Sequence, residues 1–324
     1  MTTATVTATK TSSNTMDLWI FRAVWLVLPF TAGPLLTRAL ETAGRPLELG
    51  GTITLWVVWA GMLIASMVPR TETLTAARII VPASLATVIV AVISLLDEGT
   101  VDVTLILAIV STGIASILVF RPQVSDAFVD GSSYGDEKRY LLSTPGALML
   151  GPIQIVWAVI VFGASVGPFL LLAERWISGG IATVIGLPLA YFALPLLHRL
   201  SYRWLVFVPA GMVVHDKTAL REPQLFRKEQ ITAFGPSPAE TTYEDLTLNA
   251  LGLALRAELI EPSKIVRNQR GADVELTDIG GFLVSPNRPG QVVTEAKERG
   301  YSICLLYTSP SPRDQRGTRM PSSA

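Results

Sequence analysis

Cysteine and histidine are scarce in this chain of 324 residues, which contains one cysteine and two histidines. One cysteine excludes a disulfide within the chain. Metal centres need several Cys, His or carboxylate ligands at short spacings, and no such spacing occurs. The GPSP stretch at 235–238 lacks the lysine and the following helix of a phosphate-binding loop, and Gly280 and Gly281 stand alone. We therefore expect no metal, no cofactor and no enzymatic activity.

Charged residues are also few. They make up 16% of the chain, whereas a soluble domain carries about 25%. The 26 basic and 26 acidic residues balance, so no overall field attracts nucleic acid. What the sequence has instead is 50% hydrophobic residues and a mean hydropathy of +0.46. This composition is typical of integral membrane proteins.

Six apolar segments of membrane-spanning length lie in the first 200 residues. A helix needs ~20 residues to cross a ~30 Å hydrocarbon core, and backbone groups in lipid must be paired internally. We therefore expect six transmembrane helices within residues 17–200, preceded by a disordered Thr/Ser/Ala-rich tail at 1–16. The segments run over residues 18–40, 52–69, 79–96, 101–120, 148–172 and 179–198.

Basic residues near the segment ends predict the orientation. If the N-terminus is inside, both termini and the connection 121–147 lie in the cytoplasm, and the protein belongs to the cell membrane. The centre of that connection, GSSYGDEKR, predicts a solvated loop, and YLL at 140–142 is a candidate for the membrane interface. The inner side then holds Lys10, Arg22, Arg70, Arg78, Arg121, Lys138, Arg139, Arg199 and Arg203, and the outer side only Arg38, Arg45 and Arg175.

Ionisable side chains are sparse inside the six segments. Arg22 and Arg38 each lie about one turn from a segment end, where the side chain can snorkel to the headgroups. Because no acidic residue lies mid-segment, a channel or small-solute transporter with a regulatory domain is our second hypothesis. His198 and His215 are the histidines available to an enzyme. His215 and Asp216 are adjacent on a predicted strand, so they should point to opposite faces.

After Arg203 the hydrophobic pattern alternates. LVFVPAGMVVHD predicts a hairpin that turns at residues 209–211, and short strands follow in LFRKEQITAFGP, KIVRNQRG and GFLVSP. Strand and helix both remain open for 236–262. NRPGQVVTEAKERG predicts a helix with Asn287 as N-cap candidate and Pro289 in its first turn. Its buried face should hold Val292, Val293 and Ala296.

These strands and helix predict a small β-barrel or sandwich, and residues 202–303 resemble bacterial PH-like domains attached to transmembrane helices. The resemblance rests on LVFVPAGMVVHD, LFRKEQITAFGP and FLVSPNRPGQVVTEAKERG. It implies a seven-stranded barrel with a C-terminal helix, forming a cytoplasmic domain of residues 201–303 without an active site. Its partners would be membrane lipids or another protein, and not nucleic acid. The candidate residues facing headgroups or a partner are Lys217, Arg221, Arg227 and Lys228.

Residues 304–324 resemble translated sequencing adapter and not protein. Residues 304–314 match one adapter block residue for residue, and 320–324 match a second block at the right separation in the same frame. Thr318 is a single-base departure from the adapter. We therefore expect the natural protein to differ after about Ile303, so that the β domain of this chain is truncated at its end. The only cysteine then carries no function.

Overall fold

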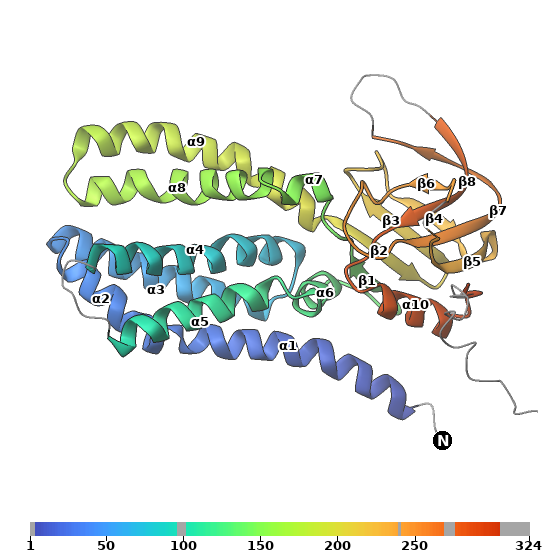
Figure 1. Cartoon of the computed structure of the whole chain (residues 1–324), viewed down its shortest axis with the longest axis horizontal. Coiled ribbons are helices and arrows are strands. Elements are labelled where there is room, and N and C mark those ends of the chain that lie inside the picture. The colour runs from blue at the N-terminus through green and yellow to red at the C-terminus, as the bar shows by residue number, and fades with distance from the viewer. Residues whose placement is uncertain (1–3, 96–101, 239–240, 269–275, 305–324) are drawn as a thin grey trace, which may run out of the picture.

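The computed structural model describes residues 4–95, 102–238, 241–268 and 276–304, with side chains described from residue 16 onward. The long helices lie side by side in one part of the molecule, and the strands gather in the other (Figure 1). Of the expected artefactual tail only Cys304 is described, and the remainder of that segment lies outside the described residues.

The long helices match the expected apolar segments. Five stretches are long and apolar enough to cross a membrane. A sixth results if α5 (Val103–Val119) and α6 (Pro122–Asp130), which meet at 57°, count as one span. Helices α1 and α2 contribute one stretch together, Met16–Glu41. The long helices are α1 (Ala4–Thr31), α2 (Gly33–Glu41), α3 (Arg45–Met67), α4 (Thr71–Leu95), α5 (Val103–Val119), α8 (Pro152–Leu172) and α9 (Trp176–Ser201).

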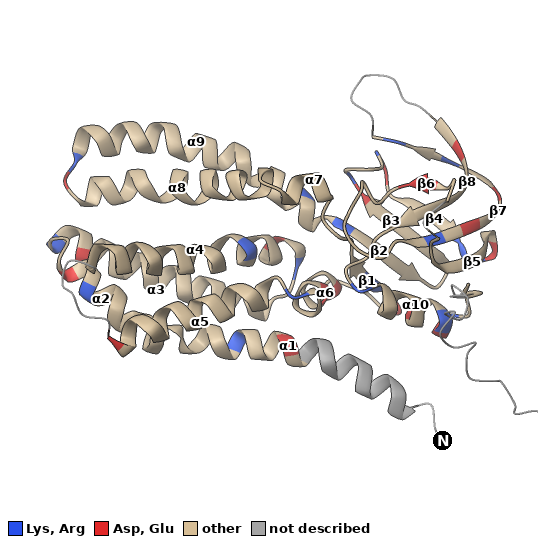
Figure 2. Ribbon diagram, viewed as in Figure 1, with Lys and Arg blue, Asp and Glu red and all other residues tan. Residues whose placement is uncertain are grey.

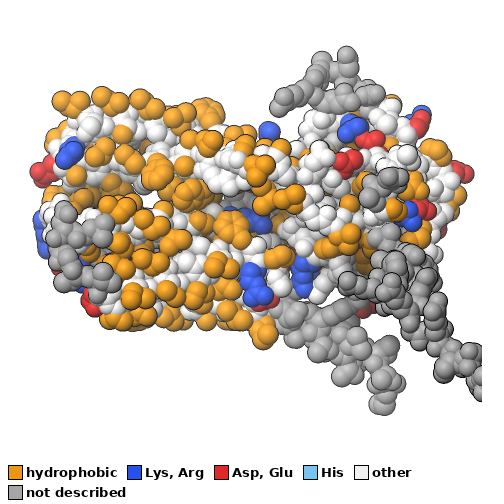
Figure 3. Space-filling model, viewed as in Figure 1, with side chains coloured by type: hydrophobic (Ala, Val, Ile, Leu, Met, Phe, Trp, Pro, Cys, Tyr) orange, Lys and Arg blue, Asp and Glu red, His pale blue; other side chains and the backbone are white. Residues whose placement is uncertain are grey.

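The surface of the helical part is apolar. Hydrophobic side chains cover the face seen in Figure 3, and Figure 2 shows charged residues gathered near the helix ends. In each of the five stretches, only between 11% and 28% of the most apolar 18 residues is buried inside the protein. A soluble bundle would bury far more of such residues, so this surface fits contact with lipid. Helix α1 already starts at Ala4, inside the segment that we predicted to be a disordered tail.

Helices α8 and α9 form a closely packed antiparallel hairpin. Gly163 and Gly167 form a GxxxG pattern on α8, and they face Gly186 and Thr183 of α9. A Cβ atom added to Gly186 would lie 2.5 Å from the Gly163 carbonyl oxygen. Small residues allow helix backbones to approach in this way inside a membrane. The FGASVG stretch carries this signal in the sequence, although our prediction of the spans did not use it.

The other spans share a core in which polar groups pair with backbone. Trp25 of α1 and Trp59 of α3 each donate an indole N–H to the other's carbonyl oxygen, at 3.0 and 2.9 Å. Arg22 donates to the Ser66 carbonyl near the end of α3, where a helix has unpaired carbonyl groups. The Arg22 side chain is therefore hydrogen-bonded within the protein, whereas the sequence predicted only that it would extend to the lipid headgroups.

The strands form two four-stranded sheets. The first has the order β1-β2-β3-β4 and is antiparallel throughout, and the second has the order β5-β7-β8-β6 with β6 parallel to β8. The expected hairpin is confirmed as β2 and β3. The strands are β1 (Lys138–Leu141), β2 (Arg203–Val208), β3 (Gly211–Asp216), β4 (Gln224–Arg227), β5 (Ile231–Pro236), β6 (Glu244–Asp245), β7 (Leu255–Val266) and β8 (Leu276–Val284).

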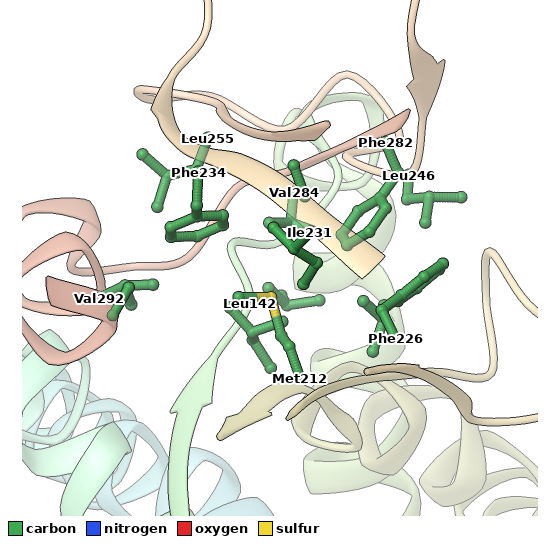
Figure 4. Close-up of a cluster of buried hydrophobic side chains, with 14 of the residues drawn as sticks. Leu142, Met212, Phe226, Ile231, Phe234, Leu246, Leu255, Phe282, Val284 and Val292 are labelled. Atoms are coloured by element: carbon green, nitrogen blue, oxygen red, sulfur yellow. The ribbon is translucent and has the colours of Figure 1, made fainter. Parts of the chain in front are cut away.

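The two sheets enclose a hydrophobic core, part of which is drawn in Figure 4. Phe226 of the first sheet stacks on Phe282 of the second with ring centroids 4.2 Å apart. Helix α10 (Pro289–Glu298) contributes Val292 and Ala296, as predicted, while Val293 is partly buried beside them.

Of the two expected alternatives, barrel or sandwich, the closed barrel is wrong for the residues that the structure describes. A barrel requires one ladder of hydrogen bonds around its circumference. Among the described residues, the two sheets are linked by isolated bridges such as Leu220 with Arg267. The 3-10 helix η2 (Lys228–Gln230) separates β4 from β5, and β6 is only two residues long. The domain is thus a pair of open sheets.

Only the centre of the connection 121–147 is the expected solvated loop: residues 131–137 form turns and are mostly exposed, whereas the rest of the connection is folded. It contains α6 (Pro122–Asp130), β1 and α7 (Gly146–Met149), and β1 adds an edge strand to the first sheet through pairs such as Leu141 with Trp204. Tyr140, Leu141 and Leu142 are buried in protein rather than placed at the interface. The β part therefore begins before residue 201 in the chain.

Asn287 does not cap α10. The N-cap residue is Arg288, without a side-chain cap hydrogen bond. The Asn287 Oδ1 atom instead accepts from the Ser143 hydroxyl at 3.1 Å, and its backbone N–H donates to the Leu141 carbonyl at 2.9 Å. The residue is thus used to bind the chain around β1.

Substitution of Gly186 by Ala tests the α8–α9 contact. The added methyl group would meet the Gly163 carbonyl, so we expect the free energy of unfolding in mixed micelles to fall by about 1–3 kcal/mol. Gly180→Ala is the matched control, because an added Cβ there has open space on the same helix. Equal effects of the two changes would contradict this packing.

Candidate site at the junction of helices and sheet

A buried ion pair lies where the last long helix passes into the first sheet. Arg203 follows α9 by two residues, and its Nε and Nη2 atoms lie 2.8 and 2.7 Å from the Asp216 Oδ2 atom. The Arg203 Nη1 atom donates to the Ser143 carbonyl at 2.9 Å. The Asp216 Oδ1 atom accepts from the backbone N–H of Thr218 at 2.9 Å. Both charged groups are therefore buried and hydrogen-bonded, as buried charges must be.

The first sheet is also bound to the helices by apolar packing. Leu141, Trp204 and Val206 belong to the same buried cluster as Phe21 of α1 and Leu74 of α4. Alternate residues of β2 point the other way, into the core between the sheets. The β part is therefore fixed against the helical part.

A second buried carboxyl group lies in the same region. Asp126 of α6 accepts the Leu141 backbone N–H at its Oδ1 atom, 3.0 Å away, and Arg288 lies 3.8 Å from its Oδ2 atom. Burial raises the pKa of Asp126 to about 7, and the Leu141 N–H and Arg288 only partly oppose this shift. Neighbouring Ser125 accepts from Arg78 of α4 at 3.0 Å.

An aromatic group surrounds the two histidines. Trp204 and His215 stack with centroids 4.5 Å apart, and the Tyr202 ring lies 5.2 Å from His215 and 5.3 Å from His198. The His198 Nδ1 atom is 2.9 Å from the Thr75 hydroxyl, and burial lowers the pKa of His215.

The expected divergence of His215 and Asp216 is confirmed. His215 lies against Trp204 on one face of the sheet, while Asp216 is paired with Arg203 in the interior. The two side chains cannot act together on one substrate. Among the residues that the structure describes, no group of three or more His, Cys, Asp or Glu could hold a metal ion.

The four basic residues of the candidate site lie at two ends of the first sheet. Asp216 pairs with Arg203 at the end beside α9, which we call the helix-proximal end, and exposed Lys217 follows it. The Lys217 Nζ atom is 5.0 Å from the centre of the Tyr202 ring. Arg221, also exposed, follows in the same connection, before β4 begins at Gln224.

Arg227 and Lys228 lie at the opposite, distal end. Arg227 pairs with Gly211, which in turn pairs with Val208 at the far end of β2. A strand of this length spans roughly 17–20 Å, so the two pairs are well separated and do not form one basic cluster. Lys228 lines a distal pocket of 170 Å³ with Val208, Pro209, Arg299 and Tyr301. That volume is below the ~300–1,000 Å³ of small-molecule sites.

In comparisons with family models, with curated proteins and with solved structures, nothing matches this chain. The resemblance to PH-like domains therefore stays a prediction. What the geometry itself establishes is a helical part with candidate spans, joined through buried polar groups to a pair of open sheets.

Sequence reasoning missed the buried polar residues of the junction. Asp126 and Arg203 were counted among loop and end positions, although both are 1% exposed. The sequence carries a weak signal that Arg203 is buried: it stands directly before WLVFV, at the start of an otherwise apolar strand. Its partner Asp216 ends the next strand, thirteen residues on, where a hairpin returns.

Substitution of Arg203 by Met tests the ion pair. The change leaves Asp216 buried without its cation, so we expect the free energy of unfolding to fall by about 3–5 kcal/mol. Arg227→Met, on an exposed distal position, should change it by no more than about 0.5 kcal/mol. Chemical unfolding of the detergent-solubilised variants measures both, and equal values would contradict the assignment.

Substitution of Asp126 by Asn tests the buried carboxyl. Its pKa is raised from 3.8 to about 7, so in this range the folded protein holds a proton that the unfolded chain has lost. The wild type should therefore lose stability as the pH rises from about 4 to about 7. The Asp126→Asn variant keeps an acceptor for Leu141 without this loss. The melting temperature of the variant should therefore rise relative to that of the wild type as the pH increases across this range. A constant difference between the two melting temperatures would contradict the prediction.

Proposed function

We propose that this chain is a non-enzymatic, multi-pass protein of the cell membrane whose β domain, PH-like in its sequence pattern, binds anionic lipid headgroups at the cytoplasmic surface. The observation that carries the proposal is the buried Arg203–Asp216 pair. It fixes the helix-proximal end of the first sheet directly below the last span. Lys217, the next residue after Asp216, is thereby held near the headgroups.

The chemistry around Lys217 supports this role. Basic side chains near an anionic leaflet contribute ~1 kcal/mol each. Tyr and Trp favour the boundary between water and lipid, because one part of the ring system is apolar and the other polar. Tyr202 provides such a ring: it is partly exposed, and the Lys217 Nζ atom lies 5.0 Å from its centre. Lys217 and Arg221 are both exposed, so they are available to lipid phosphates.

The number of basic residues at the two ends of the helices supports the orientation. At the ends far from the sheets, the described basic residues are Arg38, Arg45 and Arg175. The ends near the sheets hold more, and the count of Lys and Arg, rather than the net charge, favours the cytoplasmic side. These residues are Arg22, Arg70, Arg78, Arg121, Arg199 and Arg203.

The double variant Lys217→Ala/Arg221→Ala tests the proposal. In nanodiscs that contain phosphatidylserine and phosphatidylcholine, we expect the number of retained phosphatidylserine molecules to fall, because two surface cations are lost. Arg227→Ala/Lys228→Ala removes the same charge from the distal end and is the matched control. Native mass spectrometry of the protein with its bound lipids measures the difference.

The contrary outcomes are distinct. Equal lipid retention in both double variants would show that the helix-proximal pair does not select anionic lipid. Capture of a soluble partner that depends on the distal pair, with unchanged lipid retention, would favour a protein-binding domain instead.

A further inference from the structure

Four exposed apolar side chains lie where the β domain meets the start of α8. Leu150 is 89% exposed and Leu251 is 68% exposed, and Met149 and Leu253 are each 47% exposed. We call these four residues the apolar patch. They come from two distant parts of the chain: the end of α7 and the connection from β6 to β7.

Backbone contacts bring the two parts together. Pro145 forms a bridge with Ala250, and the Gly146 N–H donates to the Asn249 carbonyl at 3.2 Å. A Cβ atom added to Gly146 would lie 3.8 Å from the Leu251 Cγ atom. Figure 1 shows α7 between α8 and the strands.

The patch continues the apolar surface of α8. That helix begins at Pro152, two residues after Leu150, and Ile155 in its first turn is 65% exposed. The patch also lies at the helix-proximal end of the domain. Leu255 pairs with Val284, and the Ser285 carbonyl accepts the N–H of Ser143, the residue bound by Arg203.

The connection from β6 to β7 packs its first two leucines on the domain and exposes its last two. Leu246 is buried and Leu248 packs on the domain core, so the first half of the segment is anchored. The Asp245 Oδ1 atom accepts from the backbone N–H and the hydroxyl of Thr247, at 2.7 and 2.6 Å. Leu248 and Asn249 then adopt left-handed backbone angles, with φ of 56° and 54°. Such angles are unfavourable for leucine and persist where surrounding contacts impose them.

The connection from β6 to β7 contains no charged residue. Residues 246–254 read LTLNALGLA, without Lys, Arg, Asp or Glu. An exposed apolar group of this kind marks an interaction site, and here it adjoins helices whose own surface faces lipid. Apolar side chains that enter a membrane interface are buried about 5–10 Å into the boundary of headgroups and acyl chains.

We propose that the apolar patch inserts into the lipid leaflet beside the start of α8 and thereby holds the β domain on the membrane. The inference rests on the proposed function only in placing this domain against the bilayer. It requires no anionic headgroup, because the driving force is burial of apolar surface.

A fluorescent label at residue 251 tests the insertion. The full chain with Cys304→Ser and Leu251→Cys is labelled with an environment-sensitive fluorophore and placed in nanodiscs of phosphatidylcholine alone. Ile260→Cys is the matched control, because Ile260 is 62% exposed in the same domain but follows Leu259, which pairs with Ile231 at the distal end. Lipids with a nitroxide near the headgroup are the quencher.

We expect a blue-shifted emission at position 251 and about twofold or greater quenching relative to position 260, since the label should lie within the interface. Leu253→Cys should behave like Leu251→Cys. Water-like emission at 251 would overturn the proposal, and so would blue-shifted emission without lipid quenching, which would mean that protein covers the patch. Because the discs carry no anionic lipid, this result is independent of headgroup binding by Lys217.

Discussion

The buried pair of Arg203 and Asp216 is the interaction on which the position of the β domain depends. Removing two charges from water is costly, and the cost is offset only when all their hydrogen bonds are made. Those bonds require the start of β2, the end of β3 and the Ser143 backbone to meet at one point. A loosely attached domain could not satisfy them. The pair therefore fixes how the β domain packs against the helices more than it adds to the net free energy of unfolding.

The second strand shows how this condition extends into the rest of the molecule. Leu205 and Phe207 point into the core between the sheets, whereas Trp204 and Val206 point into the cluster shared with the helices. One strand of six residues thus serves two hydrophobic cores. The edge strand β1 does the same with Tyr140 and Leu141, one on each side. A sheet buried on both faces cannot swing away from the helices without opening a core.

The parts of this architecture that sequence reasoning predicted are those with a local signal. Long apolar segments and the hairpin of β2 and β3 follow from hydropathy and alternation within a few residues. Strand β1 has no such signal, because KRYL is short and half charged, and it becomes a strand only by pairing with β2. Lys217 and Lys228 were predicted as one basic group because they are close in sequence. The β3–β4 hairpin reverses the chain between them and places them at opposite ends. Barrel closure likewise depends on long-range ladders that a count of strands does not determine.

A domain held rigidly at a membrane surface can use weak contacts that a free domain could not. A soluble domain that binds a membrane loses translational and rotational freedom. In a chain whose domain is packed against its own transmembrane helices, that freedom has already been lost on folding. A surface cation contributes about 1 kcal/mol near anionic lipid, too little to recruit a soluble protein alone. Lys217 and Leu251, at the same end of the domain, would nevertheless both contribute to membrane contact, because the folded chain already holds the domain at the membrane surface. They differ in their response to conditions: salt screens the attraction of Lys217 for headgroups, but it does not weaken the burial of Leu251 in the same way.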